Sequence, residues 1–159
     1  MADDLLARGY VNLAVLDISQ KALDVARARL GRAGSSVQWI HADAMQPILL
    51  PCSLDVWHDR AVFHFLTKIE ERRAYVRAVL RAVKPRGHVI ISTFGPEGPT
   101  NCSGLKTMRY DAEALHKEFG ALFQLLESSN EVHHTPFGTT QQFLYCHCLV
   151  SITKRSAGD

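Results

Sequence analysis

Short apolar runs and longer segments with helical spacing alternate along the chain. The runs over residues 12–18, 37–42, 54–58 and 88–94 are typical of strands buried on both faces of a sheet. Segments 20–30, 69–83 and 111–119 place apolar side chains three or four residues apart, which predicts helices. A short helix around Leu5 and Leu6 is expected to end at Gly9, and Ser19 is expected to cap the next helix.

Two further strands are predicted over residues 123–131 and 142–153, joined by a loop from His133 to Thr140. Because no helix separates them, we expect them to pair antiparallel. The order of elements predicts one α/β domain over residues 1–159, with a mostly parallel sheet and an antiparallel C-terminal hairpin. Ligands bind such sheets at the carboxyl ends of the strands.

The composition is that of a globular chain, since 47% of its 159 residues are apolar and 21% are charged. A net charge of +2 gives no electrostatic reason to expect a nucleic acid or a membrane surface as a partner. The acidic start of the chain is unlike a signal peptide. Four cysteines are too few for a disulfide scaffold, so we expect reduced thiols in a cytoplasmic protein.

The first three predicted strands each run into an aspartate: Asp17, Asp43 and Asp59. A carboxylate at the end of a parallel strand points into the ligand crevice. By position, Asp17 suits two ribose hydroxyls, Asp43 suits an exocyclic amine such as that of adenine, and Asp59 is expected nearer the reacting group. Aspartate is also a common cap and turn residue, so each of the three has a purely structural alternative.

Four segments resemble, in order and spacing, the successive motifs of class I S-adenosylmethionine-dependent methyltransferases: 15–19 (VLDIS), 41–44 (HADA), 54–60 (LDVWHDR) and 80–90 (LRAVKPRGHVI). This resemblance covers nearly the whole chain and implies a Rossmann-like methyltransferase sheet. Residues 57–66 and 135–140 look most like small bacterial methyltransferases related to lysine methyltransferases and, more distantly, thiopurine methyltransferases.

The resemblance implies S-adenosylmethionine as the cofactor, with contacts from Asp17, Ile18, Ser19, Asp43, Ala44 and His58. In this scheme Asp17 holds the ribose hydroxyls and Ile18 packs against the adenine. Asp43 reads the adenine together with the backbone amide of Ala44. The methyl-transfer end is lined by His58, Asp59 and Arg60.

His64 is a further catalytic candidate, because an imidazole next to this end can serve as a general base for the substrate nucleophile. The alternative is a histidine that packs beside Phe63 and Phe65 at a helix start. Asp59, Arg60 and His64 are therefore the predicted catalytic residues.

One element of the family has no counterpart in the sequence. The Gly-rich loop after the first strand is absent, because Gly9 is the only glycine before Gly31. The resemblance implies that the first strand is missing too, and that its place lies between strands 12–18 and 54–58. Unless these two strands pair with each other, their edges are open to another chain, so we expect a homodimer. A longer natural chain that carries the loop is the other alternative.

Other polar residues have mainly structural interpretations. Cys146 and Cys148 share one face of a predicted strand and are expected in the core, with a soft-metal site as the alternative. His133 and His134 are expected in a loop, with a substrate lid as the alternative. Arg72 and the arginines that follow it are expected on a solvated helix face, since Glu70 and Glu71 adjoin them.

The sequence thus predicts a methyltransferase-like protein that uses S-adenosylmethionine to methylate an amine, on a protein lysine or on a small molecule. The alternative is a non-enzymatic, dimeric remnant of the fold that serves as a binding or metal- and stress-tolerance module. No metal, nucleic acid or membrane partner is predicted.

Overall fold

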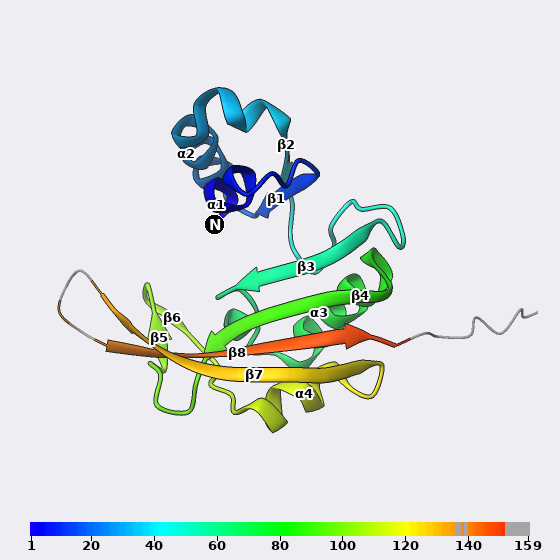
Figure 1. Ribbon diagram of the computed structural model, residues 1–159. Helices are drawn as coiled ribbons and strands as arrows, with labels where there is room; N and C mark the ends of the chain where they lie inside the picture. Colours follow the sequence, from blue (N-terminus) through cyan, green and yellow to red (C-terminus); the bar gives the residue numbers. More distant parts are fainter. Residues whose placement is uncertain (136–137, 139, 152–159) are drawn as a thin grey trace, which may run out of the picture. The chain divides into compact units, whose positions relative to one another are not determined.

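The chain divides into two units, residues 1–48 and 49–159, which we describe one at a time. The structure is a computed structural model and describes residues 1–135, 138 and 140–151. Helices and strands are labelled in Figure 1. No helix in these described ranges is both long and apolar enough to cross a membrane.

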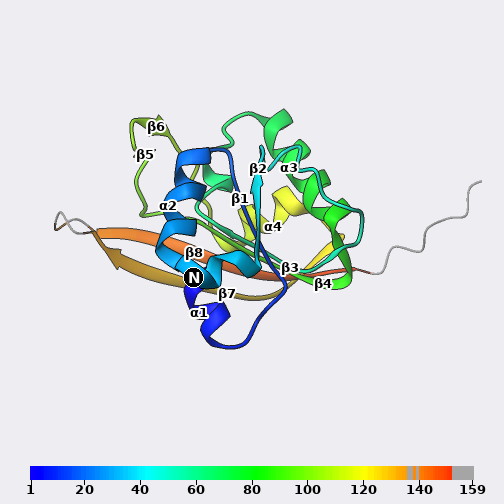
Figure 2. The ribbon, with the colours of Figure 1, turned by 90° about the horizontal axis from the view of Figure 1, so that it is seen from above.

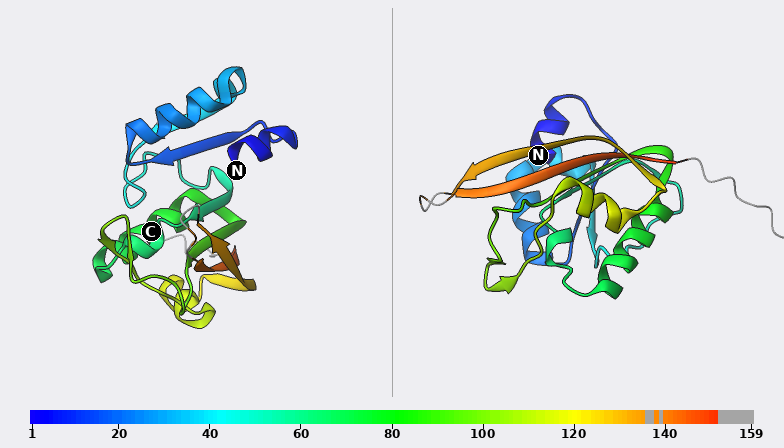
Figure 3. Two further views of the ribbon diagram at one scale, coloured as in Figure 1. Left: turned by 90° about the vertical axis from the view of Figure 1, so that its left-hand side faces the viewer. Right: turned by 90° about the horizontal axis from the view of Figure 1, so that it is seen from below.

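The first unit is a parallel βαβ motif preceded by a short helix. Its elements are α1 (Ala2–Ala7), β1 (Leu13–Asp17), α2 (Gln20–Leu30), a 3-10 helix (Gly31–Ser36) and β2 (Val37–His41). β1 and β2 pair in parallel, and α2 runs alongside β1 in the left view of Figure 3. As predicted, the Ser19 side chain caps α2 by accepting a hydrogen bond from the Ala22 amide at 3.3 Å.

The second unit is built on a four-stranded mixed sheet in the order β3-β4-β8-β7. Its strands are β3 (Leu54–Arg60), β4 (Val83–Phe94), β7 (Phe123–His134) and β8 (Thr140–Val150). β3 and β4 are parallel, whereas β8 pairs antiparallel with both β4 and β7 (Figures 1 and 2). The predicted mostly parallel α/β fold with an antiparallel C-terminal hairpin is confirmed.

The helices of this unit cover one face of the sheet, as the right view of Figure 3 shows. They are α3 (Ile69–Ala82), α4 (Ala112–Phe119) and a 3-10 helix (Phe63–Phe65), and a small hairpin of β5 (Asn101–Cys102) and β6 (Leu105–Lys106) lies between β4 and α4 in sequence. Edge-to-face ring contacts join Trp57 on β3 to Tyr75 on α3 and Phe119 on α4 to Phe123 on β7. We call this the covered face of the sheet. The other face carries residues of opposite parity, such as His58 and Arg60.

Two predicted boundaries are wrong. α3 ends where the Pro–Gly segment predicted, but β4 starts at once at Val83 instead of His88. The register between β3 and β4 shifts at residues 84–87, which form a bulge. Leu54 pairs with Val83 and Val56 pairs with His88, so these four residues of β4 lie opposite Asp55 alone. Gly87 is required in this bulge, since a Cβ there would lie 2.6 Å from Cγ1 of Val83.

The second error concerns His133 and His134, which belong to β7 and pair with Gln141 and Thr140. They were expected in a loop because β7 is polar over most of its length and gives little apolar signal. Of the predicted 135–140 segment, residues 136, 137 and 139 lie outside the described residues, as do residues 152 and 153 of the predicted last strand.

Candidate functional site

The first unit brings two of the three predicted aspartates to one end of its sheet. Asp17 is the last residue of β1, and Asp43 follows β2 by two residues. Because the strands are parallel, with Asp17 in register with His41, both carboxylates lie at the carboxyl end of the β1–β2 pair. The Ala42 amide donates to the Asp17 carbonyl at 3.2 Å, which ties the two chain segments together just beyond the strands.

Each of these two carboxylates makes one local hydrogen bond. Oδ1 of Asp17 accepts from the Ser19 amide at 2.7 Å, and Oδ1 of Asp43 accepts from the Met45 amide at 2.8 Å. Within the part of the chain that the structure describes, the second oxygen of each has no hydrogen-bond partner. Each aspartate can therefore stabilise its turn and bind a ligand at the same time. One oxygen accepts from the turn amide, and the other is free to accept from a ligand.

An apolar side chain stands next to these acids. Ile18 is 71% exposed and lies between Asp17 and Ser19, the cap of α2. Its backbone is held, because Nε2 of His41 donates to the Ile18 carbonyl at 3.0 Å. Ser19 uses its hydroxyl oxygen for the α2 cap, and Ala44 lies in the turn after Asp43. The unit thus presents two free carboxylate oxygens beside an apolar surface.

Asp59 differs from the other two aspartates. It lies inside β3 as the penultimate residue, is 5% exposed and belongs to the covered face. Its Oδ1 accepts from the Val62 amide at 2.9 Å, and its Oδ2 accepts from the Phe63 amide at 3.0 Å and from the Tyr75 hydroxyl at 2.6 Å. Burial raises the pKa of Asp59, while these hydrogen bonds act in the opposite direction.

The three consecutive residues predicted at the methyl-transfer end do not share a face. Asp59 points to the covered face, whereas His58 and Arg60 are exposed on the opposite face, because successive side chains of a strand alternate. Burial, with the nearby charge of Arg60, lowers the pKa of His58. The sequence motif therefore supplies two outward-facing basic side chains and one inward-facing carboxylate.

His64 is fully buried in the 3-10 turn after β3. Its Nδ1 accepts from the Phe94 amide at 3.2 Å, and its ring stacks on that of Phe94 at 4.3 Å. Burial lowers its pKa to about 4, so the ring is neutral at pH 7 and its one proton is on Nε2. The lone pair is already engaged, and this geometry makes His64 a hydrogen-bond donor rather than the general base that the sequence suggested.

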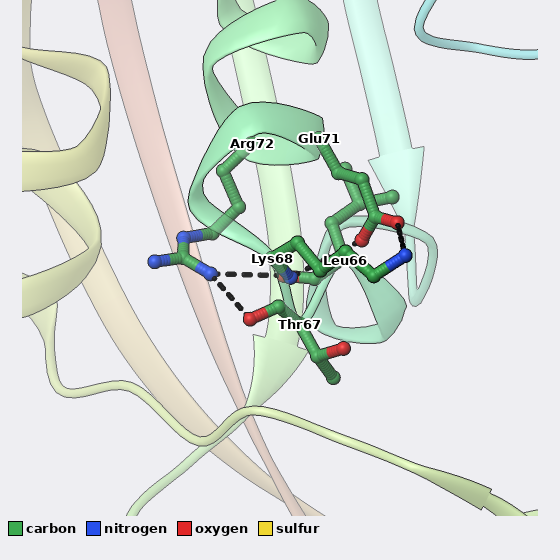
Figure 4. A network of polar contacts seen from close by, with 5 residues as sticks. All are labelled: Leu66, Thr67, Lys68, Glu71 and Arg72. Atoms are coloured by element: carbon green, nitrogen blue, oxygen red, sulfur yellow. Dashed lines mark hydrogen bonds and ion pairs between the residues drawn. The ribbon is translucent and has the colours of Figure 1, made fainter.

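Arg72 is a structural residue that the sequence interpretation missed. Its Nη1 donates to the carbonyls of Leu66 and Thr67 at 3.2 and 3.0 Å (Figure 4), and its Nε lies 2.9 Å from Oε1 of Glu118 on α4. It was assigned to a solvated face, yet it precedes buried Tyr75 by three residues and therefore lies on the apolar stripe of α3. That spacing was the signal available in the sequence.

Cys146 and Cys148 are buried on the covered face, as predicted for core residues. Burial raises the pKa of their thiols to about 12 and about 11, so both are protonated at pH 7. In residues 1–135, 138 and 140–151, no group of three or more histidine, cysteine or acidic side chains is arranged to hold a metal ion.

Residues 1–91 match the family described as methyltransferase domain, so the chain belongs to this family. A comparison with curated proteins gives no match.

This chain has the same fold as solved structures of S-adenosylmethionine-dependent methyltransferases. One from Methanosarcina mazei aligns with a TM-score of 0.76 at 13% identity and covers 96% of this chain and 87% of that one. The 1,6-didemethyltoxoflavin-N1-methyltransferase of Burkholderia thailandensis, solved with S-adenosylhomocysteine, gives 0.71 at 15%, covering 94% and 65%. A structure from work on thioacetal formation in echinomycin biosynthesis gives 0.78 at 17%, covering 98% and 72%.

Proposed function

We propose that this protein binds S-adenosylmethionine and transfers its methyl group to an amine, on a protein lysine or on a small molecule. The observation that carries the proposal is the pair of carboxylates at the end of β1 and β2, each with one oxygen free for a ligand. Family membership supports the reaction class, and the S-adenosylhomocysteine in the Burkholderia structure supports the cofactor.

The residues of the first unit fit the nucleoside part of this cofactor. The free oxygen of Asp17 accepts from ribose hydroxyls, and that of Asp43 accepts from the adenine amine. Exposed Ile18 provides an apolar surface for the adenine ring, while Ser19 and Ala44 supply the neighbouring backbone. When bound, the cofactor supplies an activated methyl group on its sulfonium, and the protein aligns the acceptor with it.

In the second unit we assign His58 to the cofactor and Arg60 and His64 to the methyl-transfer end. The Nε2–H of His64 is buried and has no hydrogen-bond partner among the described residues, so it is a donor that the protein leaves unused at this end. Asp59 contributes to the same end through the turn that it holds.

Calorimetric titration with S-adenosylmethionine tests the proposal. We expect wild type to bind and Asp17→Ala to lose at least tenfold in affinity, because the ribose hydroxyls lose their acceptor. Asp24→Ala is the matched control, since Asp24 is an exposed carboxylate of the same unit, and within the described ranges its side chain bonds only to Gln20. Equal affinity of Asp17→Ala and wild type would contradict the ribose assignment.

We also propose that the chain forms a homodimer in the cytoplasm. In the described residues β3 pairs along one edge only, with β4, and its Val56 is 50% exposed. Besides Ile18, the first unit exposes large apolar side chains that a second copy can cover: Met1, Tyr10, Val11, Val25 and Ile48. Light scattering at high dilution tests this, and a monomer there would contradict it.

The non-enzymatic alternative is favoured by one feature of the sequence, the absence of any glycine between Gly9 and Gly31. A dimer that gives no binding heat at millimolar S-adenosylmethionine would support that alternative over the enzyme.

A further inference from the structure

The turn that follows β3 has a backbone conformation that its own residues do not favour. Ala61 has a φ of 66°, in the left-handed region that side chains with a Cβ rarely adopt. The turn continues into the 3-10 helix Phe63–Phe65, which carries His64. Such a segment keeps one shape only if its surroundings fix it.

The Asp59 carboxylate provides this fixation from the start of the turn. Its two oxygens accept from the Val62 and Phe63 amides, which are the donors that the short helix itself leaves unpaired. At the end of the turn the Phe94 amide donates to Nδ1 of His64, and the Met108 amide donates to the His64 carbonyl at 2.8 Å. The position of His64 therefore depends on contacts at both ends of this short segment.

Asp59 is in turn held by Tyr75 from α3. The Trp57 indole nitrogen lies 2.9 Å from the Tyr75 hydroxyl, and an indole N–H can only donate. The Tyr75 hydroxyl must therefore use its own proton toward Oδ2 of Asp59, at 2.6 Å. This fixes the direction of the chain of hydrogen bonds from Trp57 through Tyr75 to Asp59, with an ionised carboxylate as its final acceptor.

The ring of Tyr75 reinforces the same arrangement. Tyr75 is 1% exposed and makes edge contacts with Trp57 and with Phe63, at centroid distances of 5.8 and 5.2 Å. Its hydroxyl reaches the carboxylate that orders the turn, and its ring packs on a residue of the turn. α3 thus determines, through one side chain, how the segment after β3 is placed.

We propose that Tyr75 is a positioning residue that acts through Asp59 to hold the turn and to present His64 at the carboxyl ends of β3 and β4. The inference rests on the proposed function, because that function puts methyl transfer at this end of the sheet. Tyr75 and Trp57 touch neither the cofactor nor the acceptor in this scheme, and their effect on transfer is indirect.

Tyr75→Phe tests the inference, because it removes the hydroxyl and keeps the ring. Tyr110→Phe is the matched control, since Tyr110 is also buried and contacts Phe63 at 5.8 Å, but its hydroxyl has no hydrogen-bond partner among the described residues. In hydrogen exchange, we expect the Val62 and Phe63 amides to exchange at least tenfold faster in Tyr75→Phe and as in wild type in Tyr110→Phe. Unchanged protection in Tyr75→Phe would overturn the inference.

A titration of the Asp59 carboxyl carbon by NMR separates positioning from a general loss of stability. The Tyr75 hydrogen bond lowers the pKa of Asp59, so we expect its titration midpoint to move to higher pH in Tyr75→Phe and to stay in place in Tyr110→Phe. If the midpoint does not move, the Tyr75 hydroxyl does not stabilise the Asp59 carboxylate, and the inference is wrong.

Kinetics then connect the turn to transfer, with polylysine as the acceptor probe. We expect kcat to fall at least tenfold in Tyr75→Phe while the Kd for S-adenosylhomocysteine stays within twofold of wild type. Equal kcat values for Tyr75→Phe and wild type would overturn the positioning role. If wild type binds no cofactor or leaves polylysine unmodified, the proposed function fails in that part, whereas the exchange and NMR results still decide the role of Tyr75 in the turn.

Discussion

The strand ends of the two units use aspartate in opposite ways. Asp17 and Asp43 are partly exposed, and one oxygen of each accepts a hydrogen bond from a turn amide. Asp59 is buried, and both of its oxygens accept hydrogen bonds from protein groups. The units as a whole differ in the same way, because of the 20 buried apolar side chains among the described residues only Leu23 and Val37 lie in the first unit. In the unit with few buried side chains, each strand-end carboxylate keeps one oxygen available for a ligand. In the unit with the larger core, the carboxylate has both oxygens bonded to protein groups.

The largest difference between the units is expected from core truncation. Phe119→Ala should lower the free energy of unfolding by about 3–5 kcal/mol, because Phe119 packs among the rings of Phe63, Tyr75 and Phe123. Val25→Ala, in the first unit and 63% exposed, should change it by less than about 0.5 kcal/mol. Urea denaturation measures both, and similar losses would break the contrast in core thickness.

Removal of the buried carboxylate comes next in size. Asp59→Ala leaves two backbone amides and the Tyr75 hydroxyl without their acceptor, which should cost about 3 kcal/mol in the free energy of unfolding. Asp43→Ala removes a single turn hydrogen bond and should cost about 1 kcal/mol. Chemical denaturation of the two variants side by side tests this, and an equal cost would mean that the carboxylates are equivalent.

These contrasts also show what the sequence could and could not predict. The apolar runs located β1 to β4 and β8, and helical spacing located α2, α3 and α4, because burial against a core imposes these periods. The prediction for β7 stopped at residue 131, short of its end at His134, because most of this strand is polar. The small β5–β6 hairpin was missed, since two-residue strands leave no periodic signal. Asp17 and Asp59 look alike in sequence. They differ because Asp59 is buried and accepts hydrogen bonds from the Val62 and Phe63 amides and from the Tyr75 hydroxyl, which comes from sixteen residues further along the chain.

Lowering the pH should reduce the free energy of unfolding of the second unit through His64. Near neutral pH this effect should be smaller than the effects of the truncations. Burial holds the folded pKa of His64 at about 4, against 6.5 for an exposed histidine, so the unfolded chain takes up the proton first as pH falls. Stability is therefore lost between about pH 6.5 and 4, by up to about 3 kcal/mol.

Comparison with His64→Gln isolates this contribution. The raised pKa of Asp59 acts in the opposite direction, because the folded protein binds that proton more readily, but it is common to both proteins and cancels in the difference. The free energy of unfolding of wild type should fall relative to that of His64→Gln from pH 6.5 to 4. Parallel pH profiles would mean that His64 is not held neutral in the folded state.

The most direct measurement follows the three carboxyl carbons by NMR while S-adenosylhomocysteine is added. Asp17 and Asp43 should shift together, at one and the same ligand concentration, because their free oxygens receive the ribose and adenine donors. Asp59 should keep its signal, since its oxygens are already taken by protein donors. Signals of Asp17 and Asp43 that stay in place at saturating ligand would contradict the assignment of this end of the first unit to the nucleoside.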